Sequence, residues 1–142
     1  MEAELTIEIA RAPEDVFSYL TDASSVPAWQ SGVQSVELVD GGRPRSGARL
    51  VEHRNLLGRE LRTTLEISEY EPPRVFALHA LDGPAPFDVR HELVPEGDGT
   101  SMRVVVEGDP AFLPGFASGL VTRRLEKQVR KDFERLKQIL ES

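Results

Sequence analysis

The sequence predicts an α+β fold in which a curved antiparallel sheet of about seven strands grips a long C-terminal helix. Three observations predict it. One strand-like segment near residue 5 stands apart from six later ones, Gly and Pro residues separate those six at short intervals, and the last segment repeats apolar residues every three or four positions. A chain of 142 residues suits a single domain over 1–142.

The first 30 residues predict one strand followed by two short helices. Apolar residues at 5, 7 and 9 alternate with Thr6 and Glu8, which is typical of a half-buried strand. Pro13 suits the first position of a helix, and the acidic residues at 14 and 15 favour its positive first turn. Apolar residues at 16, 17 and 20 then share one face. A second short helix or turn is expected around Pro27 and Trp29.

Six segments between residues 33 and 107 predict the rest of the sheet. The clearest alternates Leu61, Thr63, Leu65 and Ile67 with polar residues. Prolines and Gly-containing turns end the segments because proline cannot donate to a strand ladder. The short connections favour an antiparallel meander. The predicted strands are Val33–Asp40, Ala48–Leu57, Glu60–Tyr70, Val75–Leu81, Phe87–Val94 and Thr100–Glu107.

The C-terminal segment predicts an amphipathic helix from about residue 114 to residue 141. Its apolar stripe comprises Leu125, Val129, Phe133, Leu136 and Leu140. Basic residues between them alternate with acidic ones, which indicates a solvated face and no nucleic-acid site. Those acidic residues are Glu126, Asp132, Glu134 and Glu141.

Two glycines precede this helix and allow two interpretations. Gly115 and Gly119 lie in an apolar stretch over 112–121. They would either let the helix pack closely on the sheet or leave a cavity between the two. A cavity of roughly 300 Å³ or more would argue for a ligand site, whereas a filled core would argue for an interaction domain.

The composition excludes several classes of function. The net charge of −7 argues against non-specific binding to nucleic acid or to anionic lipid. The absence of cysteine excludes disulfides, thiolate metal ligands and a cysteine nucleophile. The N-terminus has no signal-peptide pattern, and no apolar run is long enough to span a bilayer, so a cytoplasmic protein without stable membrane insertion is expected.

Several short motifs, in this order, resemble the START-like (SRPBCC) superfamily, near the polyketide cyclase/dehydrase and lipid transport group. The resemblance covers nearly the whole chain. It implies a helix-grip fold with a deep cavity between sheet and helix. The motifs lie at residues 12–22 before Trp29, at 47–49, at 69–74, at 97–100 and at 136–141.

Three functions are compatible with such a domain. The leading hypothesis is binding or carriage of a hydrophobic small molecule, such as a lipid, an isoprenoid or a polyketide-like compound, with no cofactor. The second is an aromatase/cyclase-like enzyme, although the resemblance implies several aromatic residues in such a pocket and this chain has one Trp and two Tyr. The third is an interaction domain without a ligand. No residue pattern predicts an oligomeric state.

The candidate ligand-binding residues lie on the strands and helices expected around the cavity. Trp29 would either contact the ligand, as the resemblance implies, or anchor the short helices in the core. His91 lies on the same face of its predicted strand as Phe87, Val89 and Leu93, and should therefore point inward. The predicted set is Trp29, Leu65, Phe87, Val89, His91, Met102, Phe112, Phe116 and Leu120.

For other polar residues on the strands, the orientation depends on which face of the strand points inward. Glu52 and Arg54 share a face that either points outward, the favoured interpretation, or forms a buried pair. The orientation of His53 and His79 stays open because both faces of their strands carry apolar residues. If the protein is an enzyme, His91 is the candidate acid/base and Arg54 the candidate enolate stabiliser. The three histidines match no metal-ligand spacing, so no metal is expected.

Overall fold

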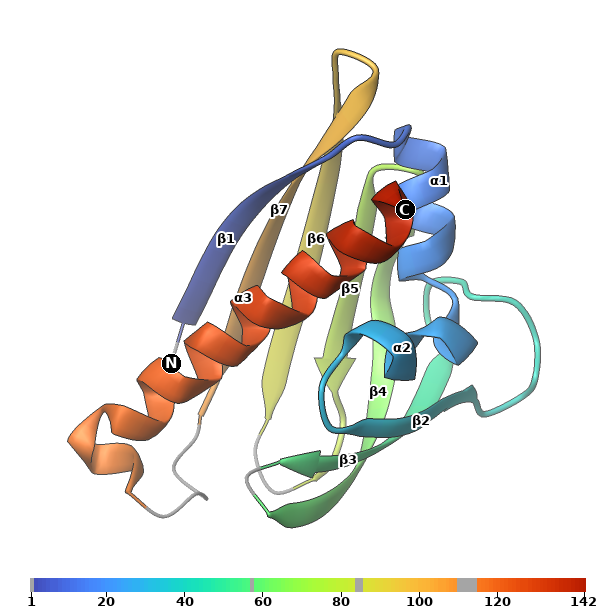
Figure 1. Ribbon diagram of the computed structural model, residues 1–142. Coiled ribbons are helices and arrows are strands. Elements are labelled where there is room, and N and C mark those ends of the chain that lie inside the picture. The colour runs from blue at the N-terminus through green and yellow to red at the C-terminus, as the bar shows by residue number, and fades with distance from the viewer. Residues whose placement is uncertain (1, 57, 84–85, 110–114) are drawn as a thin grey trace.

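The sheet is a seven-stranded antiparallel sheet in the order β1-β7-β6-β5-β4-β3-β2, as seen in the computed structural model (Figure 1). The structure describes residues 2–56, 58–83, 86–109 and 115–142. The seven strands are β1 (Glu2–Ile9), β2 (Val33–Leu38), β3 (Arg49–Leu56), β4 (Arg59–Glu71), β5 (Val75–Ala80), β6 (Phe87–Glu96) and β7 (Gly99–Gly108). The predicted α+β helix-grip fold is confirmed.

Two short helices and one 3₁₀ turn connect β1 to β2, as the sequence predicts. They are α1 (Pro13–Leu20), the 3₁₀ turn η1 (Ala23–Ser25) and α2 (Val26–Trp29). The helix α1 starts with proline and buries Val16, Phe17 and Leu20 on one face. The Asp22 side chain caps η1 by accepting a hydrogen bond from the Ser24 backbone N–H. These elements close one side of the sheet (Figure 1).

The long helix α3 (Leu120–Glu141) crosses the concave face of the sheet (Figure 1). It is shorter than predicted, because a 3₁₀ turn, η3 (Phe116–Ser118), precedes it and Gly119 interrupts the helical path with a φ of 78°. That left-handed conformation favours glycine. A Cβ at Gly119 would approach only the Arg123 side chain, at 3.7 Å. This glycine therefore serves the turn and not close packing on the sheet.

The C-terminal end of α3 is fixed against the connection between β1 and α1. The Arg11 guanidinium donates a hydrogen bond of 2.8 Å to the Leu140 carbonyl, and the Ala10 backbone N–H donates one of 2.8 Å to Glu141. Lys137 also donates to the Glu8 carbonyl. The N-terminal half of α3 makes no such contact with β1 among the hydrogen bonds of the described residues, so the helix is clamped at one end.

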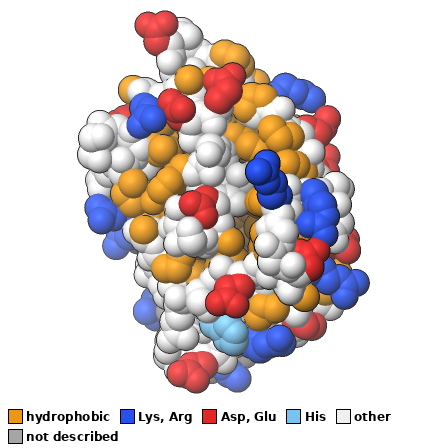
Figure 2. All heavy atoms as spheres, turned by 90° about the vertical axis from the view of Figure 1, so that its right-hand side faces the viewer, with side chains coloured by type: hydrophobic (Ala, Val, Ile, Leu, Met, Phe, Trp, Pro, Cys, Tyr) orange, Lys and Arg blue, Asp and Glu red, His pale blue; other side chains and the backbone are white. Residues whose placement is uncertain are grey.

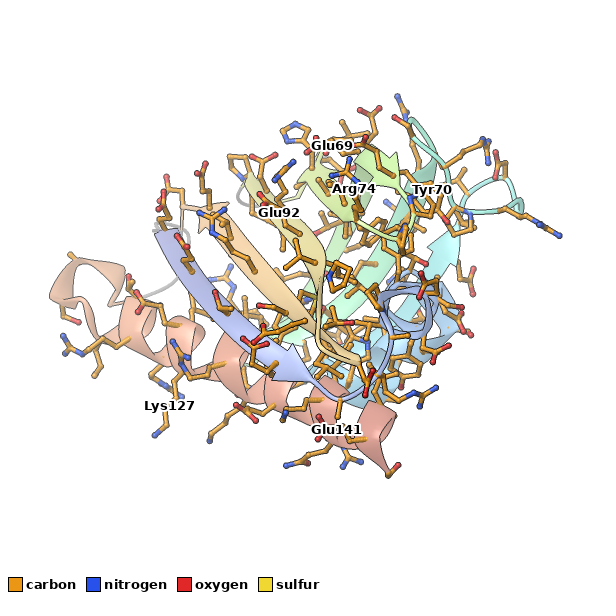
Figure 3. The ribbon with its side chains drawn as sticks, turned by 90° about the horizontal axis from the view of Figure 1, so that it is seen from above. Glu69, Tyr70, Arg74, Glu92, Lys127 and Glu141 are labelled. Atoms are coloured by element: carbon orange, nitrogen blue, oxygen red, sulfur yellow. The ribbon has the colours of Figure 1, made fainter. Side chains whose placement is uncertain are left out.

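The core lies between the concave face and α3. Leu136, Met102 and Val104 have no exposed surface, and Leu65, Ile67 and Leu93 have almost none. Side chains with the opposite strand parity face solvent and form ion pairs instead. Arg90, for example, contacts Glu69 at 2.7 Å. Figure 3 shows Lys127 on the side of α3 turned away from the sheet, as expected for a solvated helix face.

Candidate functional site: a cavity between the sheet and the long helix

A largely apolar cavity of about 230 Å³ lies between the middle of the sheet, α2 and α3. Strands β2 to β7 contribute one wall because their inward-facing residues repeat with period two. The other wall comes from three α3 residues at helical spacing, Leu125, Val129 and Phe133. The apolar part of the sheet wall comprises Val36, Leu50, Leu56, Leu61, Leu65, Ile67, Phe76, Leu78, Phe87, Val89 and Val106.

Aromatic rings fix one region of the cavity wall. The Trp29 ring lies 5.0 Å from the Phe133 ring, centroid to centroid, and joins α2 to α3. Trp29 is 4% exposed and also lines the cavity, so it is both a core anchor and an available ligand contact. Its indole Nε1 has no hydrogen-bond partner in the described part of the chain. The two interpretations of Trp29 are thus compatible.

His91 points inward, as its strand parity predicts, and is 3% exposed. Its ring stacks on Phe76, with centroids 5.6 Å apart, and also contacts the Phe133 ring at 5.7 Å. Nδ1 lies 2.8 Å from the Phe76 carbonyl oxygen. Burial lowers the pKa of His91 to about 4, against a smaller opposite effect of that hydrogen bond. The ring is therefore neutral at pH 7, with its proton on Nδ1.

Glu52 and Arg54 correct the sequence interpretation, which favoured a surface pair. Both line the cavity, Glu52 is 6% exposed, and the Arg54 Nε lies 2.9 Å from the Glu52 Oε1. Arg54 also donates to the Gln30 side chain at the end of α2. Strand β3 carries apolar residues on both faces, so its alternation did not identify the inner one. Burial of the carboxylate is tolerated because Arg54 pairs with it.

Asp132 is a site residue that the sequence analysis placed on the solvated helix face. It is 7% exposed, lines the cavity, and accepts hydrogen bonds from the Ser31 backbone N–H at 3.1 Å and from Gln128 at 2.9 Å. Burial raises its pKa, and these hydrogen bonds and the charge of Arg54 partly oppose that effect. Asp132 follows Val129 by three residues and precedes Leu136 by four, and this helical spacing was the sequence signal that it lies on the buried face of α3.

The structure brings six of the predicted site residues together: Trp29, Leu65, Phe87, Val89, His91 and Arg54 line the cavity. Two predictions are corrected. Met102 is fully buried in the core without lining the cavity, and Leu120 is 55% exposed at the start of α3. Phe112 lies outside the described residues. Only the backbone of Phe116 is described, as part of η3.

The remaining histidines lie away from the cavity. His53 is exposed, and His79 pairs with Asp88 at 2.7 Å on the outer side of β5 and β6. The three histidines therefore do not converge. The described residues contain no group of three His, Asp or Glu side chains placed to hold a metal ion. Within the same part of the chain, no helix combines the length and hydrophobicity needed to cross a bilayer.

The sheet, the gripping helix and the residues between them define a START-like domain with a helix-grip fold. The chain belongs to the polyketide cyclase/dehydrase and lipid transport family, whose model matches residues 1–141. A comparison with curated proteins gave no match.

Solved structures support the same fold. A protein from Thermus thermophilus is 20% identical with a TM-score of 0.81, covering 99% of this chain and 97% of its own. A START superfamily protein from Mycobacterium smegmatis is 19% identical with a TM-score of 0.75, covering 97% and 98%. A conserved protein from Geobacillus kaustophilus is 16% identical with a TM-score of 0.78, covering 99% and 95%. At these identities the likeness concerns the fold alone.

Proposed function

We propose that this protein binds a compact, mostly apolar small molecule in the cavity between the sheet and α3, and carries it. The observation that carries the proposal is the cavity itself, a space of about 230 Å³ with apolar walls and few polar groups. Ligand sites usually have that composition, because apolar burial supplies affinity and a few polar groups fix orientation.

The size of the cavity narrows the class of ligand. Drug-sized ligands occupy sites of roughly 300–1,000 Å³, and this cavity is somewhat smaller. We therefore favour a molecule of one or two rings over a long-chain lipid. The inward-facing polar groups His91, Glu52 and Asp132 favour the ligand site, because an interaction domain has no need to bury them.

Native mass spectrometry of the purified protein, compared with its denatured mass, tests the proposal. We expect a population heavier than the chain by one small apolar molecule, which organic extraction then releases for identification. If the native mass equals the chain mass, and a panel of one- and two-ring apolar compounds adds no mass, the binding function is wrong.

Trp29 supplies an independent optical readout. It is the only tryptophan of the chain, and it lines the cavity. A ligand that enters the cavity should change the fluorescence emission of Trp29, either by direct contact or by moving the neighbouring Phe133 ring of α3. An unchanged emission during binding proven by mass would remove Trp29 from the site while leaving the cavity proposal intact.

Catalysis of an aldol or dehydration step is a second candidate, and one observation favours it. His91 is a neutral, buried imidazole at the cavity and can accept a proton through Nε2. The test is exchange of the α-protons of 2-tetralone in D₂O, followed by NMR. Catalysis predicts exchange that exceeds the buffer rate and is lost in His91→Asn. Exchange at the buffer rate with the wild-type protein would contradict it.

A further inference from the structure

We propose that the cavity selects an apolar ligand that carries a hydroxyl group, which donates a hydrogen bond to Nε2 of His91, and that it disfavours the corresponding carboxylate. This inference rests on the proposed binding function and names the chemical class of its ligand. It follows from the orientation of one buried ring and from the charges around it.

The hydrogen bond of Nδ1 determines what Nε2 can do. A carbonyl oxygen only accepts, so Nδ1 must donate to Phe76 across their 2.8 Å contact. In a neutral imidazole the other nitrogen then carries a lone pair and no proton. Nε2 of His91 is therefore an acceptor, and it cannot donate to a ketone or carboxylate.

None of the described residues donates a hydrogen bond to this acceptor. Within the described residues, the single hydrogen bond of the His91 ring is the one to Phe76. The ring lines the cavity and is held between Phe76 and Phe133, so it cannot rotate freely to find another partner. The acceptor is therefore open to a ligand that supplies a donor, and such a ligand gains one net hydrogen bond.

The charged groups around the cavity favour the same class of ligand. Among the described residues, three carboxylates line it, Glu52, Asp109 and Asp132, against one cation, Arg54. Arg54 is already engaged by Glu52 and Gln30. An anionic ligand would meet excess negative charge and a cation that a carboxylate already neutralises. A neutral hydroxyl group avoids this repulsion and can donate to Nε2 of His91.

Three probes of similar shape separate these effects: 2-naphthol donates a hydrogen bond, 2-methylnaphthalene does not, and 2-naphthoate is anionic. Isothermal titration calorimetry of the wild-type protein at pH 7 should give 2-naphthol a Kd about five- to tenfold lower than 2-methylnaphthalene, the effect of one net hydrogen bond. The weakest binding should come from 2-naphthoate. Equal affinities, or preference for 2-naphthoate, would overturn this inference alone. No binding of any probe would overturn the binding function too.

Two substitutions then assign the acceptor. In His91→Asn the amide N–H₂ can take the place of Nδ1 and keep the bond to Phe76, while the acceptor is lost. In His91→Gln the amide oxygen can reach the Nε2 position instead. We expect the preference for 2-naphthol to disappear in His91→Asn and to survive in His91→Gln. A preference that persists in His91→Asn would overturn the assignment. The comparison of probes on the wild-type protein needs no variant and stands if either variant fails to fold.

Discussion

The two faces of the sheet use the same types of charged residue in different ways. On the outer face, Arg90 and Arg103 share Glu92, and both remain about half exposed. On the inner face, Glu52 pairs with Arg54 in a setting where the Glu52 side chain is 8% exposed. Water screens the outer pairs, so each contributes little to stability. Less water reaches the inner pair, so each partner depends more strongly on the other.

The same contrast applies to the histidines. His79 on the outer face pairs with Asp88 and keeps access to water. His91 on the inner face lies against Phe76 and Phe133 and stays neutral. An imidazole therefore acts as a solvated surface group at one position and as a fixed acceptor at the other. Figure 2 shows how the face that carries α1, α2 and β2 mixes hydrophobic side chains with charged ones.

The largest predicted effect is a dependence of stability on pH through His91. Its folded pKa of about 4 lies below the unfolded value of about 6.5. As the pH falls from 6.5 toward 4, the unfolded chain binds a proton that the folded protein does not, so the free energy of unfolding falls. We expect a loss of about 2–3 kcal/mol between pH 7 and 4.5.

Urea denaturation of the wild type and of His91→Asn at both pH values measures this effect. Asp132 works in the opposite direction, because its raised pKa favours the protonated folded form as the pH falls. It is present in both proteins and cancels in their difference. If the two proteins lose equal stability on acidification, His91 is not the group responsible.

The next effect compares the inner and outer ion pairs. Glu52→Ala leaves Arg54 without its carboxylate, and we expect a loss of about 2–3 kcal/mol, at the lower end for buried pairs because Arg54 keeps some contact with water. The matched control Glu92→Ala should cost about 0–1 kcal/mol. Chemical denaturation at pH 7 measures both. Equal losses would mean that the inner pair is as well solvated as the outer one.

A smaller effect is expected at Asp132. Asp132→Asn removes the buried charge and keeps an oxygen that accepts from Ser31 and Gln128. We therefore expect the free energy of unfolding to change by no more than about 1 kcal/mol at pH 7. The amide accepts weaker hydrogen bonds than the carboxylate, but the protein no longer has to bury a charge. A loss above that range would show that the charge of Asp132 balances Arg54 in the folded protein.

The smallest effect is expected from Arg103→Ala on the outer face. Arg103 contacts Glu4 at 2.7 Å and Glu92 at 3.4 Å, with nearly half of its side chain exposed. We expect a loss well below that of Glu52→Ala, and one that diminishes further in 1 M NaCl. A larger loss, or one that salt leaves unchanged, would mean that these pairs act as a desolvated network.

The sequence predicted the strand pattern well where one face is apolar and the other polar. In β4 the alternation through Leu61, Thr63, Leu65 and Ile67 identified the inner face, and parity identified the orientation of His91. It failed where polar groups are buried in pairs. Hydropathy treats Glu52 and Asp132 as solvated. Arg54 and Gln128 lie on the same elements as the carboxylates they contact, but only the whole fold buries these faces and brings Ser31 to Asp132.

The start of α3 was predicted too early for a local reason. Apolar residues continue the helical pattern before residue 120, but the positive φ angles at Gly115 and Gly119 break the helical path. Periodicity does not report such a turn. Leu120 consequently lies exposed at the first position of the helix, outside the cavity that it was expected to line.

The most direct test of the central claim, that the cavity between sheet and α3 takes a compact apolar ligand, fills that cavity. Val89→Phe adds a ring to a residue that lines it, and Val105→Phe makes the same change on the outer face of β7. Titration calorimetry with 2-methylnaphthalene should show binding to the wild type and Val105→Phe, and at least about tenfold weaker binding to Val89→Phe, about 1.4 kcal/mol. Equal binding to all three, or no binding to the wild type, would contradict the account.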